Sequence, residues 1–171
     1  SVTIHVNEFI EAIEKAAANA KDLGAKRGDK LGLGVFTTIS KSADATAEKD
    51  GVAQAYTNYS ATTFSSDGKI TSCIIDASQT DVNFSVDGKL KTDLNTEFKT
   101  KDELGEAYGM KKQSKIGKEW SEQAAALASY VVGKTVDQVK GIAVNEEGVP
   151  TEAELTSSVT IHIGDYITVI E

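Results

Sequence analysis

Residues 55–76 read AYTNYSATTFSSDGKITSCIID, and this stretch decides the fold. Its first part, Tyr56–Phe64, is rich in Thr and Tyr, which favour β-strands. The dipeptide Asp67-Gly68 is typical of a two-residue hairpin turn, and Ile70–Asp76 continues as a second apolar run. The stretch therefore predicts an antiparallel β-hairpin.

Further strands are expected on both sides of this hairpin. Apolar and small residues alternate from Leu31 onward and predict a strand to about Ser40, followed by a solvated loop over 41–51. A second Asp-Gly pair, at 87–88, joins residues 82–86 to residues 89–91. Together these runs predict an antiparallel meander whose strands are adjacent in sequence.

Helical patterns are predicted at the N-terminus and throughout the second half of the chain. An amphipathic helix is expected from Val6 to about Lys21, and a core helix from about Lys118 to Val132. The last helix is expected to begin near Thr160. Three segments fit a capping box, in which a hydroxyl and a carboxyl or amide side chain pair with free N–H groups of the first turn; they begin at Thr100, Thr135 and Thr151. The fold class predicted is α+β, with an antiparallel β-meander in the first half and helices packed against it.

Length and charge limit the classes of function. A chain of 171 residues suits one domain with one core. The formal net charge of −8 disfavours nucleic acid and anionic membrane surfaces as partners. The apolar runs are too short to span a bilayer, and no signal-peptide pattern is found. The single cysteine, Cys73, has apolar neighbours and is expected in the core.

The two ends of the chain are similar to each other. Residues 1–14 read SVTIHVNEFIEAIE and residues 158–171 read SVTIHIGDYITVIE, with eight identical positions at a shift of 157 residues. This similarity predicts a tandem-repeat protein from which the chain is a fragment. Residues 1–22 are then the helix that ends a preceding repeat, and residues 23–171 form one domain. Adjacent repeat copies are expected partners, and such strings of domains favour an extracellular or cell-surface location.

Few residues suggest catalysis or metal binding. The two histidines, His5 and His162, occupy equivalent repeat positions, so one unit has a single histidine for a metal site or a catalytic triad. Glu103, Glu106 and Glu119 are expected on solvated helix faces, and Trp120 in the core. No catalytic or metal-ligating residue is therefore predicted.

One segment is a candidate for binding an anion. Residues 155–161 read LTSSVTI and precede the predicted last helix. Free backbone N–H groups and the positive end of the helix dipole would stabilise a phosphate there. The alternative is that the Ser and Thr residues are ordinary N-caps.

Two of these segments resemble the FMN-binding domain family. They are the hairpin at 55–76 and the segment Ser157-Ser158-Val159-Thr160-Ile161. In flavinylated members the second motif reads Ser/Thr-Gly-Ala-Thr, and a dedicated transferase esterifies its last threonine with the phosphate of FMN. The resemblance implies that FMN binds at Thr160 with Ser157 and Ser158, and at Thr3 in the preceding repeat.

The motif is degenerate in this chain, because Ser158 and Val159 stand where the family has Gly and Ala. Gly allows a close backbone approach that β-branched Val restricts. Residues 103–148 are also similar to extracytoplasmic, flavin-carrier-like repeat proteins of anaerobic Gram-positive bacteria.

Two functions remain open at this stage. The first is an extracytoplasmic flavin and electron carrier, with a flavin transferase and redox proteins as partners. The second is a non-catalytic surface or scaffold module that has lost the cofactor. A flavin ring needs an apolar or aromatic wall; the candidates are Tyr56, Tyr59, Tyr108, Trp120 and Tyr166.

Overall fold

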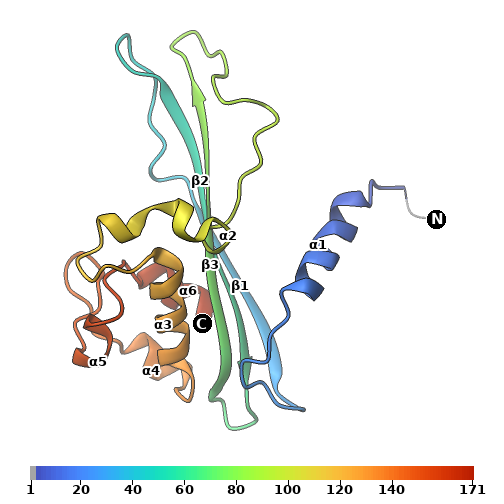
Figure 1. Cartoon of the computed structure of the whole chain (residues 1–171), viewed down its shortest axis with the longest axis vertical. Helices are drawn as coiled ribbons and strands as arrows, with labels where there is room; N and C mark the ends of the chain where they lie inside the picture. Colours follow the sequence, from blue (N-terminus) through green and yellow to red (C-terminus); the bar gives the residue numbers. More distant parts are fainter. Residues whose placement is uncertain (1–2) are drawn as a thin grey trace.

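The computed structural model describes residues 3–171. Its centre is a three-stranded antiparallel sheet of order β1-β2-β3, and most of the helices cover one face of it (Figure 1). The strands are β1 (Lys30–Thr38), β2 (Gly51–Phe64) and β3 (Ile70–Phe84). This arrangement confirms the predicted α+β class.

The predicted hairpin is the long β2–β3 pair. Its turn closes at Asp67-Gly68, where Gly68 takes a positive φ of 79° that suits glycine. The second Asp-Gly turn also forms, and Phe84 and Leu90 make an isolated bridge across it. Residues 89–91 nevertheless do not form a strand, and residues 82–84 are the end of β3 instead of a separate strand, so the last two predicted strands of the meander were wrong. This segment is short and exposed, and it buries no apolar face that would hold it on the sheet.

The helical half consists of short elements around two helices that pack on the sheet. α3 packs against β3, and α6 packs against β1 and β2. The helices are α2 (Lys101–Leu104), α3 (Trp120–Val131), α4 (Val136–Lys140), α5 (Ala153–Thr156) and α6 (Gly164–Ile170), with 3₁₀ turns η1 (Gly105–Tyr108) and η2 (Met110–Lys112).

The capping predictions had mixed outcomes. The capping boxes at Thr100 and Thr135 are both present, at the starts of α2 and α4. The one predicted at Thr151 was wrong, because α5 is preceded by Glu152 and has no side-chain cap. The last helix begins at Gly164, four residues later than predicted. The backbone before it is held by other partners: the N–H of Thr160 donates to a side chain of α3, and that of Ile163 donates to the carbonyl of Gly148.

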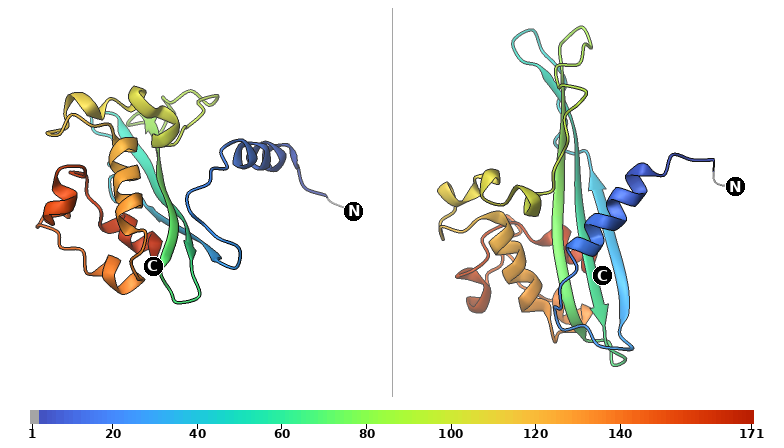
Figure 2. Two further views of the ribbon diagram at one scale, coloured as in Figure 1. Left: turned by 60° about the horizontal axis from the view of Figure 1, so that its bottom comes forward. Right: turned by 45° about the vertical axis from the view of Figure 1, so that its right-hand side comes forward.

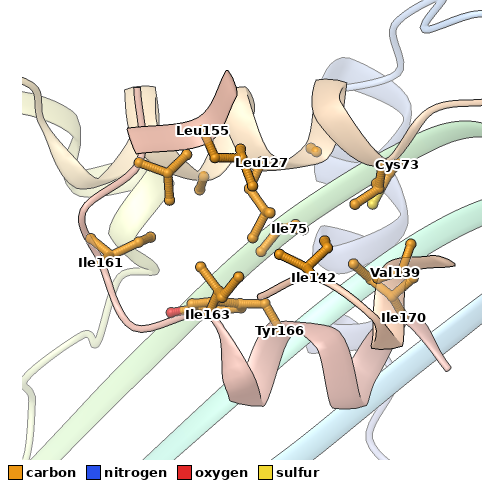
Figure 3. Close-up of a cluster of buried hydrophobic side chains, with 14 of the residues drawn as sticks. Cys73, Ile75, Leu127, Val139, Ile142, Leu155, Ile161, Ile163, Tyr166 and Ile170 are labelled. Atoms are coloured by element: carbon orange, nitrogen blue, oxygen red, sulfur yellow. The ribbon is translucent and has the colours of Figure 1, made fainter. Parts of the chain in front are cut away.

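The core lies between the sheet and the helical layer (Figure 3). Its side chains come from β3, the helices and the segments that connect the helices; those labelled in Figure 3 are Cys73, Ile75, Leu127, Val139, Ile142, Leu155, Ile161, Ile163, Tyr166 and Ile170. Cys73 is buried, as predicted. The inward face of β2 is instead polar. Ser60 and Thr62 form hydrogen bonds to each other and to the Cys73 thiol, and the fully buried amide of Asn58 has no hydrogen-bond partner within residues 3–171.

The N-terminal helix α1 (Asn7–Ala18) lies on the other side of the sheet from the helical layer and stands apart from it (Figures 1 and 2). None of its residues is buried. An ion pair between Lys15 and Glu103 connects it to α2. Its assignment to a preceding repeat, with residues 23–171 as one domain, stays a prediction. Between residues 3 and 171, no helix combines the length and the apolar character that crossing a membrane requires.

Candidate functional site

A cleft of about 660 Å³ opens between two segments of the helical layer. One wall is the segment from α2 to the start of α3, and the other comes from residues 145–149 and 160–166; these segments are yellow to orange and red in Figure 1. We call it the aromatic cleft; its lining is Tyr56, Lys101, Tyr108, Gly109, Met110, Gln113, Ser114, Lys115, Trp120, Gln123, Asn145, Glu147, Val149, Thr160, Ile161, His162 and Tyr166. Its volume is in the range of small-molecule sites in proteins.

Four aromatic side chains lie together in this cleft. The rings of Trp120 and Tyr166 have centroids 5.9 Å apart at an interplanar angle of 58°. The hydroxyl of Tyr166 lies 3.1 Å from that of Tyr56, and Tyr108 lines the cleft beside them. These are four of the five candidates from the sequence; the fifth, Tyr59, faces the opposite side of β2. Trp120 is buried as predicted, and it also lines the cleft.

Lys101 is the most unusual residue of the cleft. It is the first residue of α2, directly after the Thr100 cap, and only 5% of it is exposed. Its Nζ donates a hydrogen bond of 2.8 Å to the Tyr56 hydroxyl. The same Nζ lies 4.7 Å from the ring centroids of Tyr56 and Tyr108 and 5.4 Å from that of Trp120. Three aromatic rings therefore surround this ammonium group, at distances where cation–π attraction operates.

The charge of Lys101 is not neutralised by a neighbouring carboxylate. Among residues 3–171, no carboxylate lies within ion-pair distance of its Nζ. The pKa of Lys101 is lowered to about 8, mainly by burial and also by the positive charge of Lys41, while Asp76 acts in the opposite direction. A buried cation without a counter-ion is costly. An anionic ligand in the cleft would supply that counter-ion.

Gln123 of α3 connects the two walls. Its side chain is fully buried, and its Oε1 accepts hydrogen bonds from the backbone N–H of Thr160 at 2.8 Å and from its hydroxyl at 3.1 Å. Its Nε2 donates to the hydroxyl of Ser114 at 3.3 Å and to the carbonyl of Lys118 at 3.2 Å. One amide therefore fixes both sides of the cleft relative to each other.

Glu119 also shapes the cleft, although the sequence placed it on a solvated helix face. That prediction was wrong, because the residue is 4% exposed. Its carboxylate accepts the N–H groups of Met110 and Lys111 at 2.9 and 3.0 Å, and its position just before α3 completes a capping box with Glu122. Glu119 thereby holds η2 against the start of α3.

The candidate residues of the LTSSVTI segment separate in the structure. Thr160 lines the cleft. Ser157 and Ser158 do not; Ser157 follows α5 and Ser158 donates to the carbonyl of Leu155. Thr3 is exposed on the segment before α1 and is not part of the cleft lining.

Neither interpretation of this segment as the start of a helix holds. The N-cap of α6 is Ile163, whose side chain cannot cap, so Ser157, Ser158 and Thr160 are not its caps. The N–H of Thr160 is used by Gln123 and is not available to a phosphate. What remains of the candidate anion site is the Thr160 hydroxyl at the edge of the cleft.

Sequence reasoning missed Lys101, Gln123 and the cleft itself. Lys101 directly follows Thr100, and Gln123 lies within the predicted helix from about Lys118 to Val132, but no local pattern distinguishes either residue from its neighbours. The sequence signal that pointed toward the cleft was the set of aromatic residues named as candidates for a flavin wall. Four of these residues meet in the cleft. A smaller cavity of about 410 Å³ adjoins the cleft and shares Tyr56, His162 and Tyr166 with it.

No family model matches the chain, and no match was found among curated proteins or among solved structures. What the chain does must therefore be argued from the chemistry of the aromatic cleft.

Proposed function

We propose that the aromatic cleft binds FMN, and that the domain is an extracytoplasmic flavin carrier in a tandem-repeat protein. The observation that carries the proposal is Lys101, a buried cation surrounded by three aromatic rings and without a carboxylate partner within ion-pair distance. FMN combines a flat aromatic ring system with an anionic phosphate. These two parts match the two chemical features of the cleft.

The residues present fit such a ligand. The rings of Tyr56, Tyr108, Trp120 and Tyr166 offer apolar surface to the flavin ring. The ammonium group of Lys101 pairs with the phosphate, and Lys115 adds a second positive charge to the lining. Bound FMN supplies reversible electron transfer. The protein's own part is to bind the ring, keep water from it and hold the phosphate.

Calorimetric titration of the full chain tests the proposal. We expect FMN to bind, and riboflavin, which lacks the phosphate, to bind at least about tenfold more weakly, the loss expected for one charge-assisted hydrogen bond. Lys101→Met should remove this difference between the two ligands. Lys112→Met is the matched control, because Lys112 is exposed and outside the cleft. Equal affinities of the native chain for FMN and riboflavin would contradict the pairing, and no binding of either would contradict the proposal.

The affinity for FMN should depend on pH through Lys101. Its pKa of about 8 means that the amine loses its proton above that pH in the free protein. Only the protonated form pairs with phosphate, so affinity should fall about tenfold from pH 7 to pH 9. The FMN phosphate is ionised throughout this range. Burial raises the pKa values of Tyr56 and Tyr108, so their hydroxyls stay neutral. Lys101→Met should give a flat profile; an equally steep one would assign the effect to another group.

The competing function is a surface module without a cofactor. Two observations favour it: Ser158 and Val159 replace the small residues of the flavinylation motif, and the Thr160 hydroxyl already donates to Gln123. Covalent attachment at Thr160 would appear as an intact mass above the sequence mass by one FMN less water, in protein from a host that has the transferase. A chain that shows neither this mass nor affinity for FMN would be the scaffold module.

A further inference from the structure

The helix α1 presents an apolar side without a partner. Phe9 is 59% exposed, Ile10 is 50% exposed and Ile13 is 68% exposed, and the preceding Ile4 is 63% exposed. These residues recur at the spacing of one helix face. A twelve-residue helix is marginally stable alone in water, and most helices depend on packing of such a face. We therefore expect the apolar face of α1 to pack against a partner surface.

The same chain shows what surface fits this sequence. At a shift of 157 residues, Phe9 corresponds to Tyr166 and Ile13 to Ile170, and each of these α6 residues is only 3% exposed. Ile4 corresponds to Ile161, which lies in the core. The backbones also agree, because the residues before the two helices, Val6 and Ile163, have φ/ψ values of −113°/−8° and −112°/−8°.

The differences between the two segments follow the burial of α6. Where α6 is buried, both copies are apolar: Ile163 is matched by Val6, Tyr166 by Phe9 and Val169 by Ala12. The largest change of polarity, Thr168 to Glu11, is at an exposed position of α6. The α1 segment therefore has apolar residues at the positions that are buried in α6, and its largest change of polarity is at a position that is exposed in α6.

The surface that receives α6 is shaped for it. α6 packs across β1 and β2, where Gly34 of β1 lies directly beneath the last turn of the helix. A Cβ at Gly34 would lie 1.8 Å from the carbonyl oxygen of Val169. Only a strand with glycine at this point lets the helix approach so closely. This sheet surface is filled by α6 itself, so α1 requires the corresponding surface of another unit.

We propose that α1, with the residues before it, closes a second copy of this fold by packing across that copy's β1 and β2 strands in the position of α6. The occupant of the apolar face of α1 is thus another repeat unit of the same kind. The linker from residue 19 to 29 then connects two folded units. This inference is independent of whether the aromatic cleft binds FMN.

Another surface near α1 is the open face of its own sheet. There Leu31, Leu33 and Val35 are more than half exposed, and Ile74 is 47% exposed. Docking of α1 on this open face would give no reason for the sequence similarity between α1 and α6. Docking there is therefore an alternative that the experiment must distinguish.

Hydrogen exchange in a tandem chain tests the proposal. A second copy of residues 15–157 is placed before residues 1–171. This first unit lacks an α6 of its own, so α1 is the segment that can take the α6 position in it. We expect the amides of α1 to exchange at least about 100-fold more slowly than in the single chain. The same tandem with Phe9→Asp and Ile13→Asp is the control and should lose this protection. Equally fast exchange of α1 in both chains would overturn the proposal. The proposal would also be overturned if the α1 amides were protected from exchange in the single chain and lost this protection on Leu33→Asp. That result would show that α1 docks on the open face of its own sheet.

A second variant decides the case in which the first unit of the tandem fails to fold. Six substitutions in the single chain give α6 the sequence of α1: I163V, G164N, D165E, Y166F, T168E and V169A. We expect this chain to unfold cooperatively, with a melting temperature lowered by smaller buried side chains but with native circular dichroism. A chain that does not fold would show that the α1 sequence cannot occupy the α6 position and would overturn the proposal.

Discussion

Gly34→Ala should detach α6 from the sheet and lower the free energy of unfolding by about 3 kcal/mol, the upper end of the cost of overpacking. The new methyl group would meet backbone atoms of Val169, which cannot move away as a flexible side chain would. The helix would have to lift and expose Tyr166 and Ile170, which are 3% exposed. Urea unfolding followed by circular dichroism measures the effect.

The matched control is Gly32→Ala on the same strand. A Cβ there would lie 3.7 Å from the Phe64 ring and 3.8 Å from the Thr62 carbonyl, which are ordinary contacts. Its effect on stability should stay within about 0.5 kcal/mol. If the two alanine variants had equal stability, the close packing of α6 on β1 would be wrong.

Gln123→Leu should also be strongly destabilising, by about 2 to 4 kcal/mol. Leu has a similar volume but leaves the N–H of Thr160 and the hydroxyl of Ser114 without their buried partner, and each lost partner costs about 1 to 3 kcal/mol. Since Gln123 connects the two cleft walls, FMN affinity should fall as well. Chemical unfolding and calorimetry on the same sample measure both effects.

Gln113→Leu serves as the control for stability, because Gln113 is exposed and belongs to one wall only. It should change the unfolding free energy by less than about 0.5 kcal/mol. An equally small effect of Gln123→Leu would mean that the Gln123 hydrogen bonds do not hold the cleft together.

The sheet could be predicted because its signals are local. Asp67-Gly68 fixes the hairpin turn, and alternation of side chains marks the strands. Alternation did not show which face of β1 is buried, because the apolar Leu31, Leu33 and Val35 lie on the open face of the sheet. The segment after Asp87-Gly88 carries the same local signal and still forms no strand. The difference is tertiary, because no buried surface holds this segment on the sheet.

The cleft could be predicted only in part. Composition offered five aromatic candidates, but their meeting point depends on how α2, α3 and α6 pack. Nothing in the sequence near Lys101 marks it as a buried residue. Its Nζ contacts Tyr56, which lies 45 positions before it on β2, and Trp120, which lies 19 positions after it on α3. Thr160 was singled out as part of a helix start, yet it lines the cleft because Gln123 holds the backbone before α6.

The most direct measurement of the central claim uses Trp120, the single tryptophan of the chain. It lines the aromatic cleft, so its fluorescence responds to a ligand that binds there. Titration with FMN should quench it along a saturating curve, and Lys101→Met should shift that curve to higher FMN concentration. Tryptophan emission that falls only in proportion to the light absorbed by free FMN, without saturation, would contradict flavin binding in the cleft.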